Sequence, residues 1–216
     1  MFMRNLEKDE REMTERRELM LETGFRIFSQ KSVEPVAMQE IADACGLGIA
    51  TLYRYFSNKT VFVIAIATRK WEEFYEIIEE EYIRRGGSMM NAAEELEFYL
   101  SSFIMLYREH ADILRFNHIF NSYIMYVGVD SEELKDYQAV TARFASKFHI
   151  LYEKGQKDKS IRTDEAEQKM FTTTMHIMLA VAVRFAQGVI YNGESKEDLT
   201  EELMVLKRMI MAQYLA

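Results

Sequence analysis

Apolar residues recur along most of this chain at steps of three and four, with charged residues between them. In the first such stretch Met20, Gly24 and Ile27 follow this spacing, and Glu and Arg occupy many of the positions around them. A period near 3.6 residues places one side of a helix toward a core and the other toward solvent. The pattern therefore predicts a protein built from amphipathic helices.

Breaks in the pattern divide the chain into about nine expected helices. Pro35 disfavours helical backbone angles at the residue before it, and Gly86 and Gly87 interrupt the longest periodic stretch. Ser57 carries a hydroxyl that can cap the helix after it. The expected helices cover residues 10–30, 38–45, 49–56, 58–84, 92–107 and 113–126, a stretch with a stripe from 134 to 151 that ends near Gly155, and two last stretches with stripes over 174–188 and 199–213.

Composition supports an all-α protein with a large core. The 216 residues include one proline and nine glycines, and 49% of them are hydrophobic. Turns and sheets draw more heavily on proline, glycine and β-branched residues, whereas abundant Glu, Met, Leu and Ala favour helices. A hydrophobic fraction of this size in a chain of this length can form a substantial core.

The sequence predicts a soluble, cytoplasmic protein with no membrane partner. Its first 18 residues are charged throughout and lack the apolar centre of a secretory signal. The longest apolar runs, 61–67 and 177–183, are too short to span a bilayer. Cys45 is the only cysteine, so the chain cannot form an internal disulfide or a zinc site of the usual spacing, and we expect a small buried residue there.

Charge is distributed unevenly along the chain, whose formal net charge is −8. Residues 1–70 hold 11 Lys and Arg against 10 Asp and Glu, whereas residues 71–216 hold 16 against 25. Such an asymmetry indicates two modules with different partners. We expect one domain at residues 1–60 and a second at residues 61–216.

Two short expected helices, 38–45 and 49–56, are joined by a turn at Gly46. Glycine allows the sharp backbone turn, and two helices joined in this way form a helix-turn-helix. The second helix of such a unit enters the major groove of DNA. Leu52 and Phe56 are four residues apart and are expected to anchor this helix to the core, which leaves its other face for DNA.

The segment MQEIADACGLGIATLYRYFSNK, residues 38–59, resembles the helix-turn-helix of the TetR family of bacterial transcriptional repressors. It has the family's Ile-Ala in the first short helix and Thr-Leu-Tyr-x-Tyr-Phe at the end of the second, followed by a lysine. Upstream, LETGFRIFSQKSVEPV is similar to the family's first helix, with Phe28 in the usual core position. The rest of the chain agrees with the family in length and helix count but carries no diagnostic motif.

Three places depart from the family's pattern. The family often has glycine at Ser32, a threonine cap at Ala37, and Ser-Lys at Gly48 and Ile49. The first two changes are expected to lower local stability slightly. Ile49 can contact a thymine methyl but cannot pair with a phosphate, so we expect an apolar contact there.

The candidates for DNA contact are small, aromatic or polar residues of the N-terminal domain. Thr51 offers a hydroxyl, and Arg54 is the best candidate for a phosphate or guanine contact. The resemblance implies that Tyr53, Tyr55 and Lys59 hold the DNA backbone, although the two tyrosines can alternatively cover the core. The full set is Gln39, Gly48, Ile49, Ala50, Thr51, Tyr53, Arg54, Tyr55 and Lys59.

The resemblance implies a ligand-responsive transcriptional regulator, specifically a repressor, that binds a pseudo-palindromic double-stranded DNA operator as a homodimer. A mainly apolar or aromatic small molecule would release it. The aromatic and methionine content of the second domain fits a ligand pocket between helices, although each aromatic residue can instead be ordinary core. The ligand candidates are Phe103, Tyr107, Phe116, Tyr123, Phe148, His176 and Phe185.

The last two expected helices carry apolar stripes that step by four and three residues. Such near-heptad spacing suits helices that pack at a shallow angle, as in a bundle. The TetR family forms its four-helix dimer interface from these helices, but both stripes can instead face the chain's own core. The dimer candidates are Met178, Val181, Phe185, Gly188, Leu199, Leu203, Leu206 and Ile210.

An enzyme and a protein-interaction module are the two alternatives to a regulator. Di-metal helical enzymes use Glu-x-x-His pairs, but the residues three before the four histidines are Tyr107, Arg115, Ser146 and Thr173. No glycine-rich phosphate loop or nucleophile elbow occurs either, so we expect no enzyme, no cofactor and no metal site. The alternative is a helical protein-interaction module, or a regulator whose N-terminal domain does not bind DNA on its own, for which salt would scarcely affect binding.

Overall fold

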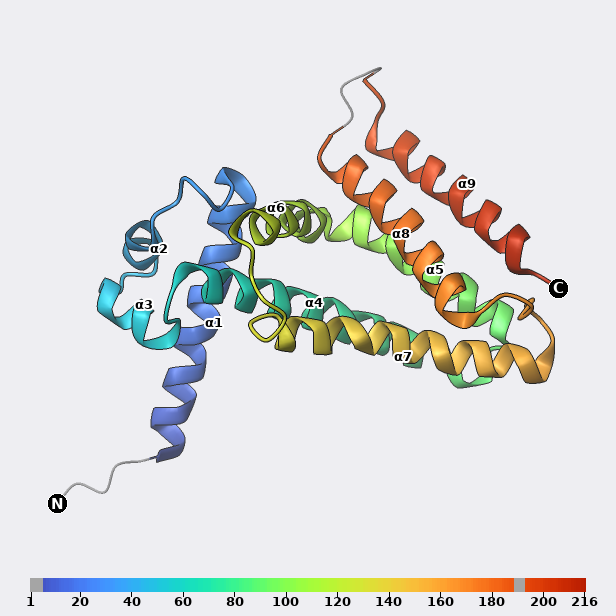
Figure 1. Cartoon of the computed structure of the whole chain (residues 1–216), viewed down its shortest axis with the longest axis horizontal. Coiled ribbons are helices and arrows are strands. Elements are labelled where there is room, and N and C mark those ends of the chain that lie inside the picture. The colour runs from blue at the N-terminus through green and yellow to red at the C-terminus, as the bar shows by residue number, and fades with distance from the viewer. Residues whose placement is uncertain (1–5, 189–192) are drawn as a thin grey trace. The chain divides into compact units, whose positions relative to one another are not determined.

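The computed structural model describes residues 6–188 and 193–216, and within these ranges the chain forms helices and no strands (Figure 1). This confirms the all-α prediction. Within the same ranges, no helix is long and apolar enough to cross a membrane. The nine α-helices of the described chain are α1 (Leu6–Lys31), α2 (Met38–Ala44), α3 (Ile49–Tyr55), α4 (Lys59–Arg84), α5 (Ala92–Glu109), α6 (Ala111–Val127), α7 (Lys135–Asp158), α8 (Glu167–Ala186) and α9 (Lys196–Tyr214), with a 3-10 helix, η1, at Gly87–Met89.

The start of α4 differs from the prediction. The backbone N–H of Val61 donates to Asn58 Oδ1 over 2.9 Å, and the helix begins at Lys59. Asn58 therefore caps α4, because a side-chain oxygen at this position reaches an unpaired amide of the first turn. The prediction that Ser57 is the cap is wrong by one residue.

The chain divides into two compact units. Unit 1 comprises Met1–Lys70 and His118–Tyr137, and unit 2 comprises Trp71–Asn117 and Gln138–Ala216. Helices α4 and α6 each contribute residues to both units. A functional domain boundary near residue 60 stays a prediction.

Unit 1 is organised around a small aromatic core between α1, α3 and α4. Phe28, Leu52 and Phe56 are buried, and the ring of Phe56 lies 4.7 Å from that of Phe62. A Cβ atom at Gly24 would lie only 2.5 Å from the Phe62 ring, so glycine allows α1 to lie close to α4. The core confirms that Leu52 and Phe56 hold α3 inward.

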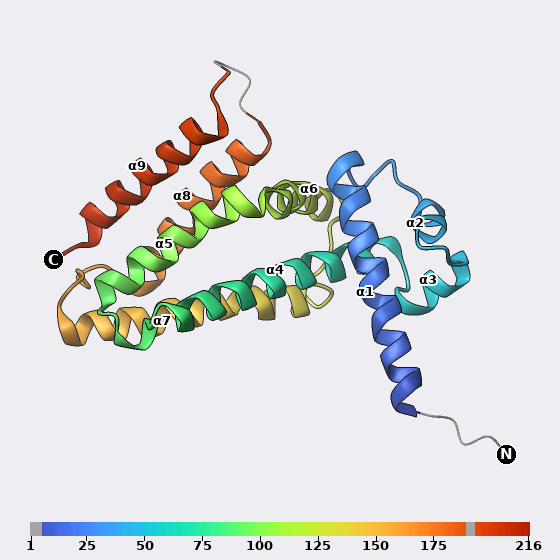
Figure 2. The ribbon, with the colours of Figure 1, turned by 180° about the vertical axis from the view of Figure 1, so that it is seen from behind.

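Unit 2 is organised around α5, which packs against both α8 and α9. The shared core includes Leu100, Met170 and Met178, all of which are buried. Figures 1 and 2 show α8 and α9 side by side. The carboxylate of Glu95 on α5 is buried and pairs with Lys154 of α7, which compensates for the cost of removing the charge from water.

Candidate nucleic-acid interface and ligand cavity

The turn between α2 and α3 has the geometry that a helix-turn-helix requires. Gly46 has a φ of 67°, a left-handed conformation that glycine adopts without steric cost. The N–H of Leu47 then donates to the carbonyl of Ala42 over 2.9 Å, and the N–H of Thr51 donates to that of Gly48 over 2.8 Å. These bonds end α2 and start α3 within a few residues, as the sequence predicted.

Helix α3 presents a polar and aromatic face to solvent. Ala50, Tyr53 and Arg54 are exposed, while Leu52 is buried on the opposite side. The guanidinium of Arg54 lies 5.9 Å from the centre of the Tyr55 ring, and no carboxylate among the described residues is recorded within ion-pair distance of it. Arg54 can therefore reach a phosphate or a guanine without first breaking an ion pair.

The remaining DNA candidates differ in how accessible their polar atoms are. Gln39 is exposed, but its amide nitrogen donates to Asp43 Oδ1 over 2.6 Å. The hydroxyl of Tyr55 is buried and has no hydrogen-bond partner in the described structure, so the ring would have to move before it could contact a phosphate. By exposure the candidates form two groups, with Gln39, Gly48, Ala50, Tyr53 and Arg54 exposed and Ile49, Thr51, Tyr55 and Lys59 half-buried.

Lys59 has a structural partner that the sequence did not reveal. Its Nζ donates to the backbone carbonyl of Glu34 over 3.1 Å, which links the start of α4 to the segment before α2. Burial lowers the pKa of Lys59, and the charge of Glu34 opposes this shift. Lys59 therefore helps to hold the helix-turn-helix in place, whether or not it also contacts DNA.

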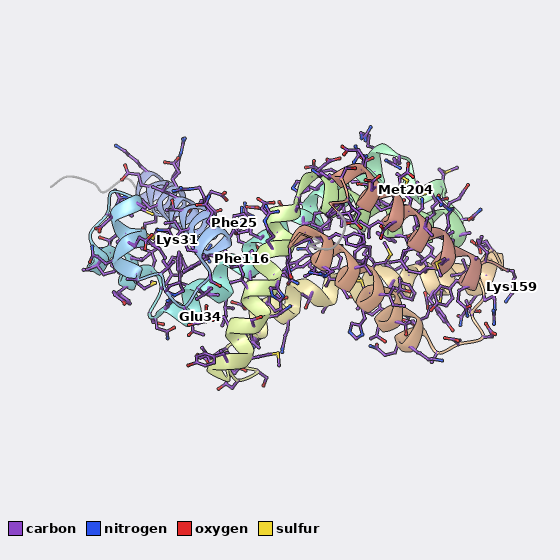
Figure 3. The ribbon with its side chains drawn as sticks, turned by 90° about the horizontal axis from the view of Figure 1, so that it is seen from above. Phe25, Lys31, Glu34, Phe116, Lys159 and Met204 are labelled. Carbon is purple, nitrogen blue, oxygen red and sulfur yellow. The ribbon has the colours of Figure 1, made fainter. Side chains whose placement is uncertain are left out.

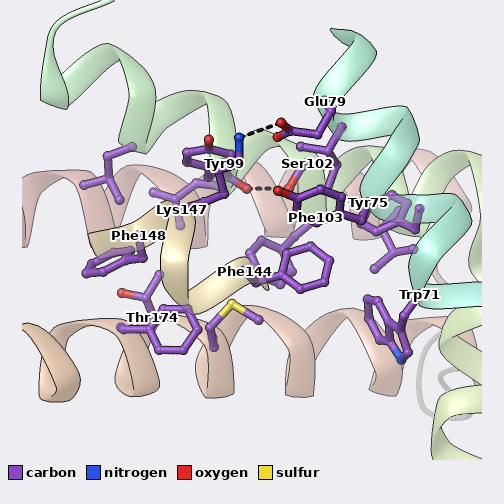
Figure 4. A pocket seen from close by; sticks show the side chains of 17 residues that line it. Trp71, Tyr75, Glu79, Tyr99, Ser102, Phe103, Phe144, Lys147, Phe148 and Thr174 are labelled. Atoms are coloured by element: carbon purple, nitrogen blue, oxygen red, sulfur yellow. Dashed lines mark hydrogen bonds and ion pairs between the residues drawn. The ribbon is translucent and has the colours of Figure 1, made fainter. Parts of the chain in front are cut away.

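Unit 2 encloses a narrow cavity of about 60 Å³ between α4, α5, α7 and α8 (Figure 4). Its walls are mostly aromatic and aliphatic, with a few polar groups, which is the usual composition of a small-molecule site. Within the cavity Lys147 Nζ lies 2.5 Å from Glu79 Oε2. The lining residues are Trp71, Phe74, Tyr75, Ile78, Glu79, Leu96, Tyr99, Leu100, Ser102, Phe103, Leu106, Phe144, Lys147, Phe148, Phe171, Thr174 and Met175.

Two of the seven ligand candidates, Phe103 and Phe148, line this cavity. His176 is exposed, because it lies two residues from buried Thr174 and so on another side of α8. The hydroxyl of Tyr123 lies 3.0 Å from that of Thr60 in unit 1. The candidates that do not line the cavity are Tyr107, Phe116, Tyr123, His176 and Phe185.

Sequence reasoning missed the residues of α4 that line the unit 2 cavity. Trp71, Tyr75 and Ile78 follow one another at steps of four and three, with Glu79 beside them. This spacing was a usable signal, because it places the four side chains on one side of a helix. All seven ligand candidates lie beyond Gly87 instead.

The dimer candidates are largely core residues of unit 2. Met178, Leu199, Leu203 and Ile210 are buried in the single chain and are not available to a partner. The stripes therefore face the chain's own core at these positions, and the reason is that α5 packs against both helices. Of the other candidates, Val181, Phe185 and Leu206 are half-buried and Gly188 is exposed.

A different set of apolar side chains on α8 and α9 faces solvent. Ile177 is 40% exposed, Val205 is 45% exposed and Met209 is 64% exposed. Met204, labelled in Figure 3, is also exposed on α9. Ile177 and Met209 line one groove between α8 and α9, and together with Val205, one turn before Met209, they form what we call the α8–α9 apolar face. Exposed apolar groups of this kind, gathered on adjacent helices, commonly mark a protein interface.

The protein is all-helical, with a helix-turn-helix in one unit and an apolar cavity in the other. These features are typical of a DNA-binding protein with a ligand-binding module. Residues 20–66 match the sequence model of a family described as bacterial regulatory proteins, tetR family. This match, over 47 of the 216 residues, confirms the resemblance to the TetR family that the motif predicted.

Relatives and solved structures agree with this assignment. The HTH-type transcriptional regulator SAB2452 of Staphylococcus aureus (strain bovine RF122 / ET3-1) is 30% identical over 71 residues, which are 32% of this chain and 38% of that protein. The match thus spans well under half of the length of this curated relative. The relatives are regulators and not enzymes.

The fold of the whole chain is similar to those of solved transcriptional regulators. One from Saccharomonospora viridis, solved in complex with choline, has a TM-score of 0.73 at 16% identity, covering 94% of this chain and 99% of that one. The regulator FadR from Bacillus subtilis, solved in complex with stearoyl-CoA, has a TM-score of 0.67 at 14% identity, covering 90% of this chain and 97% of that one. At these identities the likeness extends to the fold alone.

Proposed function

We propose that this protein is a transcriptional repressor that binds a pseudo-palindromic operator as a homodimer and is released by a small molecule. The observation that carries the proposal is the face of α3. Arg54 and Tyr53 are exposed there, and Leu52 and Phe56 fix the helix to the core from the other side. A rigid helix with exposed cationic and aromatic side chains suits insertion into the major groove.

Two copies are needed because one helix of this length makes few base contacts. A symmetric dimer that reads two half-sites supplies the remaining affinity. The α8–α9 apolar face supports this part of the proposal, because its side chains are exposed in the single chain and would lose contact with water in a dimer. The dimer would therefore use this face in place of the buried stripe.

Release by a ligand would follow from differential binding. A molecule that fills the unit 2 cavity and prefers a conformation unable to reach both half-sites would weaken operator binding. Helix α4 supports this route, because Lys59 at its start bonds to the segment before α2 and Tyr75 and Glu79 further along line the cavity. The ligands of the two solved regulators, choline and stearoyl-CoA, differ so much that the fold does not dictate the ligand.

The DNA-binding part of the proposal is tested by fluorescence anisotropy on a labelled duplex of random sequence at several salt concentrations. Affinity is expected to fall steeply with salt, with a slope of about −0.9 in log affinity against log salt for each phosphate contact. Arg54→Ala should weaken binding and reduce this slope by about 1 per subunit. Arg108→Ala, which removes an exposed arginine of unit 2, is the matched control and should change neither.

A protein-interaction module gives a different result. Its affinity for DNA would be negligible at low salt, and Arg54→Ala would behave like Arg108→Ala. That pattern would reject the repressor proposal whatever the cavity binds.

A further inference from the structure

Three of the residues that line the unit 2 cavity each carry a buried polar atom with no hydrogen-bond partner among the described residues. They are Glu79 Oε1, the hydroxyl of Tyr99 and Thr174 Oγ1. Buried polar atoms are nearly always paired, and an unpaired one destabilises the folded protein. Three such atoms around one cavity indicate that something other than the protein pairs with them.

The charge of the cavity limits what that partner can be. Lys147 Nζ lies 2.5 Å from Glu79 Oε2, so the two charges already compensate each other. Burial lowers the pKa of Lys147, but the hydrogen bond from its Nζ to Glu79 and the charge of Glu79 raise it by more, so the ammonium is retained. A ligand with a net charge would leave an unpaired charge in an apolar site, which is costly. The cavity therefore favours an uncharged ligand.

The positive charge of Arg143 does not change the preference of the cavity for an uncharged ligand. Its guanidinium carbon lies 3.8 Å from the centre of the Tyr75 ring, where the aromatic face already holds the cation. Arg143 is also exposed, so its charge remains in contact with water.

The direction of hydrogen bonding follows from the chemistry of each atom. The carboxylate of Glu79 can only accept, so the ligand must donate there. Tyr99 and Thr174 carry hydroxyls that can donate or accept. Burial and the charge of Glu95 raise the pKa of Tyr99, which keeps its hydroxyl protonated.

Figure 4 shows where these groups lie around the cavity. Glu79 and Tyr99 are on one side, close to Lys147, and Thr174 is on the opposite wall formed by α8. Phe103 and Phe144 are among the aromatic residues labelled around the cavity. A ligand that reaches both walls needs polar groups at its two ends. Because a single aromatic ring needs more room than the present 60 Å³, flexible side chains such as Met175 would have to shift to admit it.

We propose that the cavity binds an uncharged single-ring aromatic molecule with hydroxyl groups at opposite ends. One hydroxyl donates to Glu79 Oε1 and accepts from the hydroxyl of Tyr99, and the other bonds to Thr174. This rests on the proposed function, in which the cavity holds the effector. It extends that function by assigning the ligand's charge, its hydroxyl groups and the three residues that select them. Neither solved regulator's ligand, choline or stearoyl-CoA, has this chemistry.

The proposal is tested with a matched series of probes on the full chain. The probes are 4-(2-hydroxyethyl)phenol, 4-ethylphenol with one hydroxyl, ethylbenzene with none, and 4-hydroxyphenylacetate with a net charge. Affinity is measured by titration calorimetry, and ¹³C-methyl methionine spectra report on Met175, which lines the cavity. Each hydroxyl should raise affinity about tenfold, and the charged analogue should bind more weakly than 4-ethylphenol.

Variants separate a ligand-binding role from a structural one. Tyr99→Phe and Thr174→Val each remove an atom that has no partner in the described structure, so they should raise the melting temperature while lowering the affinity of 4-(2-hydroxyethyl)phenol about tenfold. Their affinity for ethylbenzene should not change. Thr172→Val is the control, because Thr172 does not line the cavity and its Oγ1 already donates to the carbonyl of Gln168 over 2.8 Å, so probe affinity should not change there.

Three results would overturn the proposal. These are equal affinity across the probe series, unchanged affinity in both Tyr99→Phe and Thr174→Val, and no binding by any probe. None of them bears on DNA binding, which the anisotropy experiment measures separately, so the two proposals can fail independently.

Discussion

Ser32 holds a strained backbone conformation. It has a φ of 69° directly after α1, and its N–H donates to the carbonyl of Phe28 over 2.9 Å. A side chain in this left-handed region meets steric resistance that glycine avoids. The TetR pattern often places glycine at this position, and the structure explains that preference physically.

Replacing this residue should therefore stabilise the protein. We expect Ser32→Gly to raise the free energy of unfolding by about 0.5–1 kcal/mol, because the gain from relieving strain exceeds the entropy that glycine adds to the unfolded chain. Thermal unfolding followed by circular dichroism measures the change. Ser32→Ala keeps the Cβ atom, and an equal gain in that variant would show that strain is not the cause.

At the residue scale, sequence reasoning succeeded where spacing decides the outcome. Leu52 and Phe56 lie four residues apart and are both buried, as their period predicted. The buried hydroxyl of Tyr55 and the bond from Lys59 to Glu34 were not predictable, because they depend on how segments distant in sequence pack together.

At the scale of elements, the close approach of α1 and α4 depends on one glycine. A Cβ atom at position 24 would lie 2.5 Å from the Phe62 ring and 2.8 Å from Ile66 Cδ1. We expect Gly24→Ala to lower the free energy of unfolding by about 1–3 kcal/mol through overpacking. Chemical denaturation measures this loss.

Gly48→Ala is the matched control for that experiment. A Cβ atom at Gly48 would meet no atom within 4 Å, and its φ of −73° suits alanine. The free energy of unfolding of Gly48→Ala should therefore stay within about 0.5 kcal/mol of that of the unchanged protein. If Gly24→Ala is equally harmless, the two helices are not closely packed at this point.

Helices α8 and α9 show that an apolar stripe identifies side chains that will be buried, but not whether they pack against the same chain or a second copy. Near-heptad spacing predicted packing at Met178, Leu203 and Ile210, and the partner of these side chains is the chain's own core. Sequence alone could not separate these two possibilities, because the apolar spacing is the same for helices packed within one chain and for helices packed across a dimer interface. Exposure in the folded chain reveals the α8–α9 apolar face instead.

A charge placed on that face should prevent dimer formation. We expect Met209→Glu to shift the protein to monomers in sedimentation equilibrium, because a buried carboxylate without a partner is costly. Met89→Glu, at a residue that is 87% exposed outside α8 and α9, should leave the oligomeric state unchanged. A dimer that persists in Met209→Glu would place the interface elsewhere.

At the scale of the whole molecule, an acidic chain can bind DNA if its positive charge is local. Residues 1–70 have 11 basic and 10 acidic side chains, whereas residues 71–216 have 16 and 25. Only the face that carries Arg54 has to approach phosphates. The uneven charge was readable from the sequence, and so was the all-α fold, whereas the cavity required the packing of four helices.

Coupling between the cavity and the DNA face is reciprocal. If a bound aromatic probe weakens operator affinity by some factor, saturating operator DNA must weaken probe affinity by the same factor. Calorimetric titration of 4-(2-hydroxyethyl)phenol into the free protein and into its DNA complex measures this directly. Equal probe affinities, together with probe-induced release of DNA, would indicate that the probe acts on the DNA or outside the cavity.

The proposed function depends on α3 reading DNA in a symmetric dimer. Its most direct test is selection from a random double-stranded DNA pool by the purified protein and by Arg54→Ala, with sequencing of the bound fraction. We expect enrichment of a pseudo-palindrome whose half-sites lie about one helical turn apart or a multiple of it, and loss of that enrichment in Arg54→Ala. No enrichment at low salt, or the same enrichment in both proteins, would contradict it.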